Sequence, residues 1–249
     1  MENILEVRDL CVRFRYGVTK IDAVEQVSFS LAQYETLGIV GGSGSGKSIL
    51  ARAILRLVPM ASGSVRFGGK DVGALRGRAL HAYFRQVQMV FQQPTASFDP
   101  RRTLGDGIGE SLRGCSRDER KARVATLLAQ CGLPAEIAAR YPHAVSGGQC
   151  QRAAIARALA VQPQLLLCDE ATSALDVTTQ AQILRLLSAL REQTGMAIIW
   201  ISHDLALVQD FCDRVLVMHG GRIVETGAPD AIICQPQHAY TKRLVDAAL

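Results

Sequence analysis

The stretch Gly41-Gly42-Ser43-Gly44-Ser45-Gly46-Lys47-Ser48 determines how the rest of this sequence is interpreted. It fits the pattern G-x-x-x-x-G-K-[ST], in which a glycine-rich loop surrounds phosphate groups. Glycine permits left-handed backbone conformations, so successive N–H groups can curl around an anion. We expect Lys47 to reach the β- and γ-phosphates of a nucleotide and the hydroxyl of Ser48 to bind Mg²⁺. An ordinary glycine-rich turn is the alternative.

The residues on either side of this loop favour the nucleotide interpretation. Residues 35–40 form a short apolar run typical of a buried strand. Residues 49–58, which begin with Ile49, are helix-forming and present a wide apolar face. Strand, glycine loop and helix form the context that a phosphate-binding loop requires, and the helix N-terminus adds a partial positive charge.

The composition is that of a globular protein with room for one large domain or two small ones. The chain has 249 residues, of which 48% are hydrophobic and 20% charged, and its net charge is +5. This charge does not by itself imply nucleic acid, and no block of five to eight basic residues occurs. Seven scattered cysteines without metal-ligand spacing indicate a reduced compartment. With neither a secretion signal nor an apolar stretch near the ~20 residues of a membrane span, we expect a cytoplasmic protein.

Strands and helices alternate along the chain. Residues 3–35 alternate in polarity and predict β-strands, and residues 64–67 add another. After a strand at 87–92, the pattern is helical from about residue 94 to 159, with a capping box at Ser116–Glu119 and a helix stop near Gly132. Further strands are expected at 165–168, 197–201 and 214–218, a helix at 178–193, and a hairpin turn at 219–221 before 222–225. The predicted architecture is α/β with a mainly parallel sheet around a helical insert.

Two carboxylates follow the apolar run Leu165-Leu166-Leu167-Cys168. Asp169 and Glu170 would then lie at the C-terminal end of a strand, where ligands bind in open α/β sheets. We expect Asp169 to hold Mg²⁺, directly or through water, and Glu170 to polarise the attacking water as a general base. An Asp-Glu pair alone is a weak signal, but one after an apolar strand in a chain with a phosphate-binding loop is a strong one.

A second phosphate-ready surface is predicted at Ser146-Gly147-Gly148-Gln149, before an alanine-rich helix. An ordinary glycine-containing helix cap is the alternative. These four residues, some twenty positions before Asp169, resemble the signature of ATP-binding cassette (ABC) ATPases, and the resemblance covers essentially the whole chain. Three positions depart from the family pattern: Gly42 stands where Glu or Pro is common, Val145 replaces the usual Leu, and Cys150 replaces a larger residue.

The resemblance implies roles for further residues. Gln92 matches the Q-loop glutamine, which senses the γ-phosphate and Mg²⁺ and connects to the membrane partner. Asp176, in Ser173-Ala174-Leu175-Asp176, matches the D-loop. His203 matches the switch histidine that contacts the γ-phosphate, although a lone histidine after an apolar strand is more often a polar cap. Phe14 occupies the place of the aromatic residue that stacks on adenine, with Tyr16 as the alternative.

The implied cofactors are ATP and Mg²⁺, and the implied site is the following. The catalytic residues are Glu170, His203 and Gln92; the metal ligands are Ser48, Gln92 and Asp169; the nucleotide contacts are Phe14, Tyr16, Gly41, Gly42, Ser43, Gly44, Ser45, Gly46, Lys47, Ser48, Ile49, Ser146, Gly147, Gly148, Gln149 and Asp176. The implied fold is a single ABC ATPase domain over 1–249. It has a RecA-like P-loop core with an N-terminal antiparallel β subdomain at 1–93 and 160–249, and an inserted helical subdomain at 94–159.

Two segments resemble the peptide and nickel importer branch of this family, namely residues 92–101 and 235–242. The branch implies a second ABC ATPase, more often a paralogue than the chain itself, so that the loop of one subunit faces Ser146–Gln149 of the other. It also implies two integral-membrane permease subunits and, indirectly, a periplasmic or lipid-anchored solute-binding protein. The expected location is the cytoplasmic face of the membrane, without nucleic acid.

Three other functions remain open at this point. One is a soluble ABC ATPase of the DNA-repair or translation type, although residues 58–145 leave no room for the long insertions those proteins carry. Another is an efflux- or lipoprotein-type cassette. The third is a nucleotide-binding regulator without hydrolysis, against which Glu170 and His203 argue. No residue specifies whether the solute is a peptide or a metal chelate.

Overall fold

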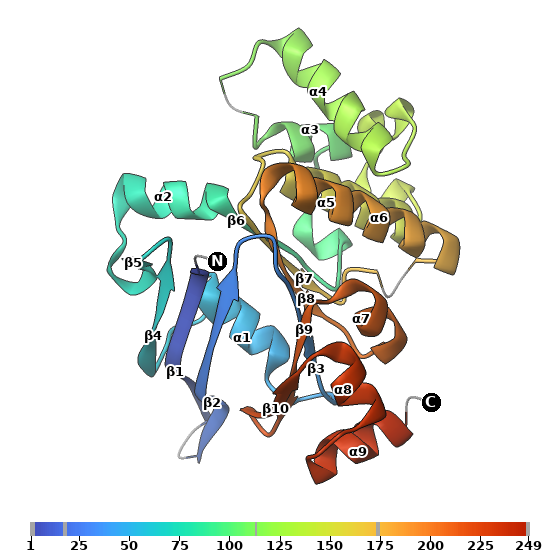
Figure 1. The fold of residues 1–249 in the computed structure, drawn as a ribbon. Coiled ribbons are helices and arrows are strands. Elements are labelled where there is room, and N and C mark those ends of the chain that lie inside the picture. Colours follow the sequence, from blue (N-terminus) through green and yellow to red (C-terminus); the bar gives the residue numbers. More distant parts are fainter. Residues whose placement is uncertain (1–2, 17–18, 113, 173–174, 248–249) are drawn as a thin grey trace. The chain divides into compact units, whose positions relative to one another are not determined.

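The computed structural model describes residues 3–16, 19–112, 114–172 and 175–247, and Figure 1 shows the order of its elements. The contacts within the chain define two compact units. The first unit comprises residues 1–84 and 196–249, and the second comprises residues 85–195. The finer division into a core and a helical subdomain at residues 94 and 159 stays a prediction.

An antiparallel sheet in the first unit is built from the N-terminal third of the chain. Its strand order is β2-β1-β4-β5. The strands are β1 (Asn3–Tyr16), β2 (Thr19–Ala32), β4 (Ser62–Phe67) and β5 (Lys70–Asp71). In the β1–β2 pair Val7 lies opposite Phe29 and Phe14 opposite Ile21. The alternating pattern of residues 3–35 is thus explained by two long strands with one buried face.

A mainly parallel sheet in the same unit carries the predicted nucleotide loop. The strands are β3 (Thr36–Val40), β8 (Ala197–Ile201), β9 (Arg214–His219) and β10 (Arg222–Gly227), and β3 pairs in parallel with both β8 and β9. Every residue of β3 and β8 is buried, as expected for unbroken apolar runs in a parallel sheet. The predicted hairpin connects β9 to antiparallel β10 through Gly220 and Gly221, whose φ angles are 55° and 80°.

The helices of the first unit flank the parallel sheet. They are α1 (Lys47–Ile54), α7 (Leu205–Phe211), α8 (Pro229–Cys234) and α9 (Ala239–Asp246), with a 3₁₀ turn η1 (Val72–Ala74). Figure 1 shows α1 on the side towards β1 and β2, and α7 and α8 on the other side. Helix α1 is shorter than the predicted run of 49–58: Arg56 has a φ of 56°, and Pro59 disfavours helix at the preceding residue, Val58.

The second unit combines a short parallel strand pair with helices. The strands are β6 (Val87–Val90) and β7 (Leu165–Asp169), and the segment between them contains α3 (Leu104–Gly109), α4 (Arg117–Gln130), α5 (Gly147–Leu159) and the turns η2 (Thr95–Ser97), η3 (Ala135–Ala139) and η4 (Pro142–Ala144). Helix α6 (Val177–Thr194) follows β7, and α2 (Gly77–Gln86) leads into this unit. The predicted capping box of α4 is confirmed, because Ser116 and Glu119 exchange hydrogen bonds of 2.9 and 3.3 Å.

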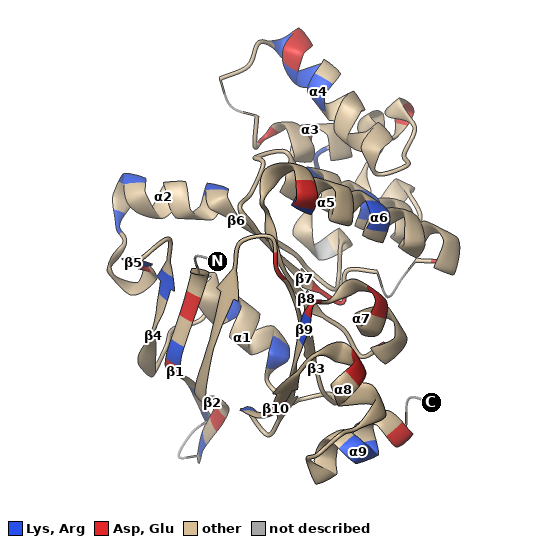
Figure 2. Cartoon of the chain, viewed as in Figure 1, with Lys and Arg blue, Asp and Glu red and all other residues tan. Residues whose placement is uncertain are grey.

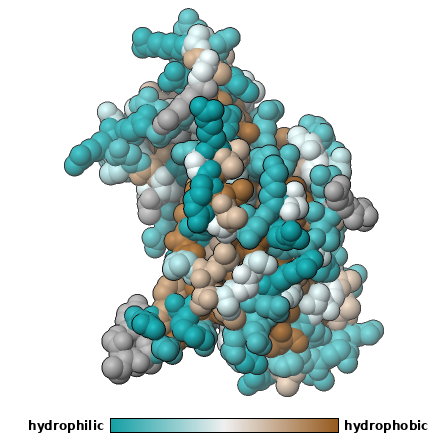
Figure 3. All heavy atoms as spheres, turned by 90° about the vertical axis from the view of Figure 1, so that its left-hand side faces the viewer, coloured by the Kyte–Doolittle hydropathy of each residue, from teal (hydrophilic) through white to brown (hydrophobic). Residues whose placement is uncertain are grey.

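Figures 2 and 3 show how charged and polar side chains are distributed on the faces that they draw. On the face drawn in Figure 3 hydrophilic side chains predominate and hydrophobic ones are interspersed among them. Figure 2 shows acidic and basic residues side by side on α4, so this helix presents no single sign of charge. Within the described ranges, no helix combines the length and hydropathy that crossing a membrane requires.

Candidate nucleotide site

The glycine-rich loop connects β3 to α1 and is shaped by neighbouring backbone. Gly41 and Gly46 have φ angles of 149° and 102°, which favour glycine. A Cβ atom on Gly41 would collide with the carbonyl oxygen of Met218, and one on Gly46 with that of Ala23. At Gly44, whose φ is 75°, a Cβ atom would meet no described heavy atom within 4 Å. The loop is therefore enclosed at both ends and open in the middle, which fits a bound phosphate group.

Lys47 provides the positive charge of this loop. Its side chain is buried, and its Nζ donates to the carbonyl oxygens of Gly41 and Gly42 at 2.7 and 2.9 Å and to the hydroxyl of Ser45 at 3.2 Å. Because Lys47 is also the first residue of α1, the ammonium group adds to the partial positive charge of the helix N-terminus. Ser48 and Ile49 follow in the first turn of the same helix. This arrangement is suited to binding polyphosphate.

The edge of the sheet that carries the loop also carries His203. Strands β3 and β8 run in parallel with Ile39 opposite Ile201, and the amide of Ser202 donates to the carbonyl of Ile39 at 3.3 Å. His203 and the loop thus leave the same edge of the sheet. Parallel strands place their carboxyl ends together, and in open α/β sheets ligands bind there.

The two candidates for adenine stacking lie on β1. Phe14 is half-buried and lies opposite Ile21 of β2. Two residues after Ile21, the carbonyl of Ala23 lies against the Gly46 end of the loop. The first unit therefore brings the Phe14 end of the β1–β2 hairpin towards the loop. The backbone of Tyr16 pairs with Thr19, but its side chain lies outside what the structure describes. The choice between Phe14 and Tyr16 stays open.

The second unit brings Gln92 and Glu170 into direct contact. Strands β6 and β7 are parallel with Val90 opposite Cys168, so the residues that follow them share one edge. Gln92 Nε2 donates to Glu170 Oε2 at 2.6 Å. Glu170 has a φ of 49°, a left-handed conformation that costs a non-glycine residue about 1–2 kcal/mol. Such strain is typical of functional positions, where the surrounding structure enforces it.

Asp169, the last residue of β7, is only 2% exposed. Burying a carboxylate is costly unless a hydrogen-bond donor, an opposite charge or a metal ion compensates it. The neighbouring Cys168 is fully buried, and this burial raises the pKa of its thiol, so Cys168 is a core residue and not a reactive one.

The predicted signature is the N-terminus of α5. Ser146 is its N-cap: Ser146 Oγ accepts from the amide of Gln149 at 3.2 Å, and Gln149 Oε1 accepts from the amide of Ser146 at 3.0 Å. Ser146 and Gly147 are exposed, and a Cβ atom on Gly147 would meet no described atom within 4 Å. The structure thus contains both the helix cap and an open surface at the helix N-terminus, where an anion can approach.

Asp176 is the N-cap of α6. Its carboxylate accepts from the amide and the hydroxyl of Thr179 at 2.9 and 2.7 Å, and these hydrogen bonds lower the pKa of Asp176. Ser173 and Ala174 of the predicted D-loop lie outside the described residues.

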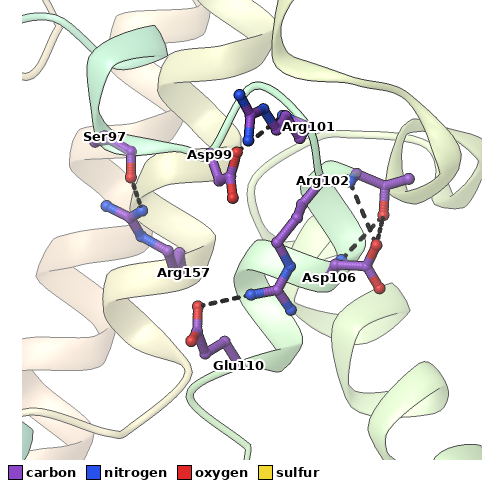
Figure 4. Close-up of polar contacts among 8 residues, drawn as sticks. Ser97, Asp99, Arg101, Arg102, Asp106, Glu110 and Arg157 are labelled. Carbon is purple, nitrogen blue, oxygen red and sulfur yellow. Dashed lines mark hydrogen bonds and ion pairs between the residues drawn. The ribbon is translucent and has the colours of Figure 1, made fainter.

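The segment that follows Gln92 is anchored by a buried arginine that sequence reasoning did not single out. Figure 4 shows Arg157 of α5 pointing at the backbone of Ser97, and its guanidinium donates to the Ser97 carbonyl. The same guanidinium lies 4.6 Å from the ring centre of Phe98. Nearby, Arg102 pairs with Glu110 at 3.2 Å in an exposed position. Nothing in the sequence indicates the Arg157 contacts, because 60 positions separate the partners.

A second unanticipated contact reaches the loop itself. The hydroxyl of Tyr240, on α9, accepts a hydrogen bond from the amide of Gly42 at 2.7 Å, across 198 positions of sequence. The spacing offers no local signal for this pair.

Taken together, a glycine-rich loop before a helix, a buried aspartate at the end of β7 and a signature-like helix N-terminus are the features of an ATP-binding cassette. The chain matches the family described as "ABC transporter" over residues 24–173. It is 49% identical over 238 residues to a probable peptide ABC transporter ATP-binding protein, y4tS, of Sinorhizobium fredii, covering 94% of this chain and 67% of that protein. The chain belongs to the ABC transporter family.

Further similarities support this family and its fold. The glutathione import ATP-binding protein GsiA of Pectobacterium atrosepticum is 47% identical over 256 residues, which are 99% of this chain and 41% of that protein, so the chain spans about two fifths of this relative. The dimeric cassette MJ0796, solved with ADP and Pi, has a TM-score of 0.85 and 29% identity over 90% of this chain and 98% of that chain. The cassette cbiO1 of Clostridium perfringens has a TM-score of 0.79 and 27% identity over 100% and 96%. The predicted fold class is confirmed.

Proposed function

We propose that this chain is the ATP-binding and ATP-hydrolysing subunit that energises a bacterial importer. The solute class is peptides or metal chelates, and peptides are favoured because relatives of this chain are named for glutathione and peptide transport. The observation that carries the hydrolytic part of the proposal is the hydrogen bond between Gln92 and Glu170 at the end of β7.

Glu170 acts as the general base in this proposal. The hydrogen bond from Gln92 orients the Glu170 carboxylate, and a carboxylate is an acceptor that can take a proton from water. The left-handed backbone of Glu170 sets the direction of that side chain. In this proposal His203 contacts the γ-phosphate from the edge of the sheet that carries the loop. Gln92 responds to the presence of that phosphate and transmits the change to the segment that follows Gln92 in the sequence.

The loop and the metal ligands bind the polyphosphate. Lys47 neutralises phosphate charge, and the amides of the loop donate to phosphate oxygens. The predicted metal ligands are the hydroxyl of Ser48, the amide oxygen of Gln92 and the carboxylate of Asp169, which are oxygen ligands of the kind that Mg²⁺ prefers. When bound, Mg²⁺ supplies charge neutralisation at the phosphate oxygens.

The signature residues serve a second subunit in this proposal. Ser146 and Gly147 are exposed at a helix N-terminus, which supports their facing the loop of a second cassette across bound ATP. A paralogue is favoured over a second copy of this chain. The complex would include two permease subunits, act at the cytoplasmic face of the membrane and receive solute from a binding protein outside it.

The test of hydrolysis is phosphate release by the assembled complex with wild-type chain and with Glu170→Gln. Loss of a general base costs about 10²–10⁴-fold in rate, so Glu170→Gln should hydrolyse at least 100-fold more slowly while retaining ATP affinity. Glu110→Gln is the matched control, because that exposed carboxylate forms a surface ion pair with Arg102. Near-normal turnover by Glu170→Gln would remove this residue from the base role.

Co-purification separates the importer from its alternatives. Two integral-membrane proteins retained with the chain support the importer, whereas nucleic acid or ribosomes retained in their place would exclude it. If the complete complex binds ATP but releases no phosphate, the chain is a regulator.

A further inference from the structure

We infer that Tyr240 is a positioning residue of the nucleotide site, through which the C-terminal helix α9 fixes the first turn of the phosphate loop and thereby sets nucleotide affinity. The inference rests on the nucleotide binding of the proposed function. It concerns a hydroxyl group, an amide and the stacked ring that holds the hydroxyl in place.

Helix α9 is itself firmly placed within the first unit. Glu225 of β10 accepts from the amides of Gln237 and His238 at 2.9 and 3.0 Å. His238 Nδ1 in turn accepts from the amide of Tyr240 at 3.1 Å and caps the helix. Thr241 is fully buried. The hydrogen bonds before Tyr240 and the burial of Thr241 after it therefore fix the position of the Tyr240 backbone.

The ring of Tyr240 is held as well as its backbone. It stacks on the imidazole of His219, the last residue of β9, with ring centres 3.9 Å apart and planes inclined by 23°. This strand end is also where the carbonyl of Met218 closes the Gly41 end of the loop. The stack leaves the hydroxyl at the amide of Gly42, 2.7 Å away.

The space around Gly42 is fitted to this hydroxyl. A Cβ atom at position 42 would lie 3.0 Å from Tyr240 Oη, closer than side-chain carbons normally approach. Glycine at this position thus leaves room for the hydroxyl, and its N–H group provides the donor that proline would lack. Gly42 and Tyr240 are complementary in both shape and hydrogen bonding.

A restraint on Gly42 matters because two consecutive glycines begin the loop. Glycine loses more conformational freedom on ordering than any other residue, and a loop that must order on binding pays for it in affinity. The hydrogen bond to Tyr240 orders the amide of Gly42 before nucleotide arrives. By linkage, nucleotide binding should in turn restrict motion of α9.

The experiment measures the affinity of the purified chain for a fluorescent ATP analogue with Mg²⁺, in wild type, Tyr240→Phe, Gly42→Ala and the double variant. A net hydrogen bond corresponds to about a three- to tenfold change in affinity, so each single variant should bind about three- to tenfold more weakly. Both substitutions break the same hydrogen bond, and phenylalanine removes the oxygen that a Cβ at position 42 would approach. The affinity of the double variant should therefore be no lower than that of the single variant with the lower affinity.

Controls separate this inference from loss of folding and from failure of nucleotide binding. Tyr34→Phe makes the same change at an exposed tyrosine before β3, at the end of that strand away from the loop, and should bind like wild type. Lys47→Ala should abolish the signal. Amide exchange over residues 239–246 should slow on nucleotide binding in wild type but not in Tyr240→Phe. The inference is overturned if Tyr240→Phe binds within twofold of wild type, or if the losses of the two single variants multiply in the double variant. If wild type does not bind the analogue, both the nucleotide assignment and this inference are overturned.

Discussion

Replacing Arg157 by methionine should destabilise the segment that follows Gln92, and the size of the effect can be worked out from the contacts. Methionine keeps an unbranched apolar stem of similar length but removes the guanidinium. The hydrogen bond from this charged group to the Ser97 carbonyl contributes about 1.5–3 kcal/mol, and the guanidinium over the Phe98 ring about 1–2 kcal/mol.

The desolvation of Arg157 opposes these gains. Burial lowers the pKa of this arginine, which reports the cost of holding its charge away from water. Methionine removes that cost, so the net loss should be about 2 kcal/mol rather than the sum of the two contacts. For a chain of 249 residues, this corresponds to a fall in Tm of about 4–8 °C.

The assay is calorimetric unfolding of wild type, Arg157→Met and Arg102→Met. Arg102 forms an exposed ion pair with Glu110, worth at most about 1 kcal/mol, so the control should shift Tm by no more than about 2–4 °C. Trypsin should also cleave after Arg101 faster in Arg157→Met than in wild type, because the neighbouring Ser97 and Phe98 lose their anchor. If Arg157→Met melts no lower than Arg102→Met and is cleaved no faster than wild type, the anchoring argument is refuted.

Two further predictions concern helix α5 and the base of α9. Ser146→Ala removes the N-cap of α5 and should cost about 1 kcal/mol, whereas Ser146→Asn keeps a capping oxygen; equal melting temperatures of these two variants would contradict the capping role. At Glu225 burial raises the pKa of the carboxyl, but the nearby hydroxyl of Thr241 and the hydrogen bonds from the amides of Gln237 and His238 outweigh it and leave the pKa lowered. The resulting stability is fully present above the unfolded pKa near ~4.3 and is lost as the pH falls through the lower folded pKa, so the Tm gap between wild type and Glu225→Gln should close only in acid. A gap that is unchanged at pH 3 would count against this assignment.

The features predicted correctly from the sequence are those encoded by neighbouring residues. The all-buried strands β3 and β8 appear as unbroken apolar runs, and the start of α4 appears as Ser116 followed three positions later by Glu119. The glycine loop can be predicted for the same reason, because its glycines and its lysine are neighbours in the sequence. These signals extend over four to eight residues, so one sequence is enough to detect them.

The features that the sequence reasoning missed have weak local signals or none. The end of α1 is set by the turn at Arg56 and by Pro59, although the apolar pattern continues to Val58. Helices α7 and α8 have seven and six residues, too few for a periodic pattern to stand out. The left-handed backbone of Glu170 has no signal at all, because glutamate does not favour that conformation.

The phosphate loop shows why a motif and its surroundings must be considered together. Its glycines look interchangeable in sequence, yet they are required for three different reasons. Gly41 is held against the carbonyl of Met218 and Gly46 against that of Ala23, so a side chain there must displace backbone. Gly44 faces open space and needs only its positive φ, which asparagine tolerates best among other residues. Gly42 has neither constraint in its own backbone, and its requirement comes from a tyrosine hydroxyl 198 positions away. The shape of the loop is therefore a property of β2, β9 and α9 as much as of the loop itself.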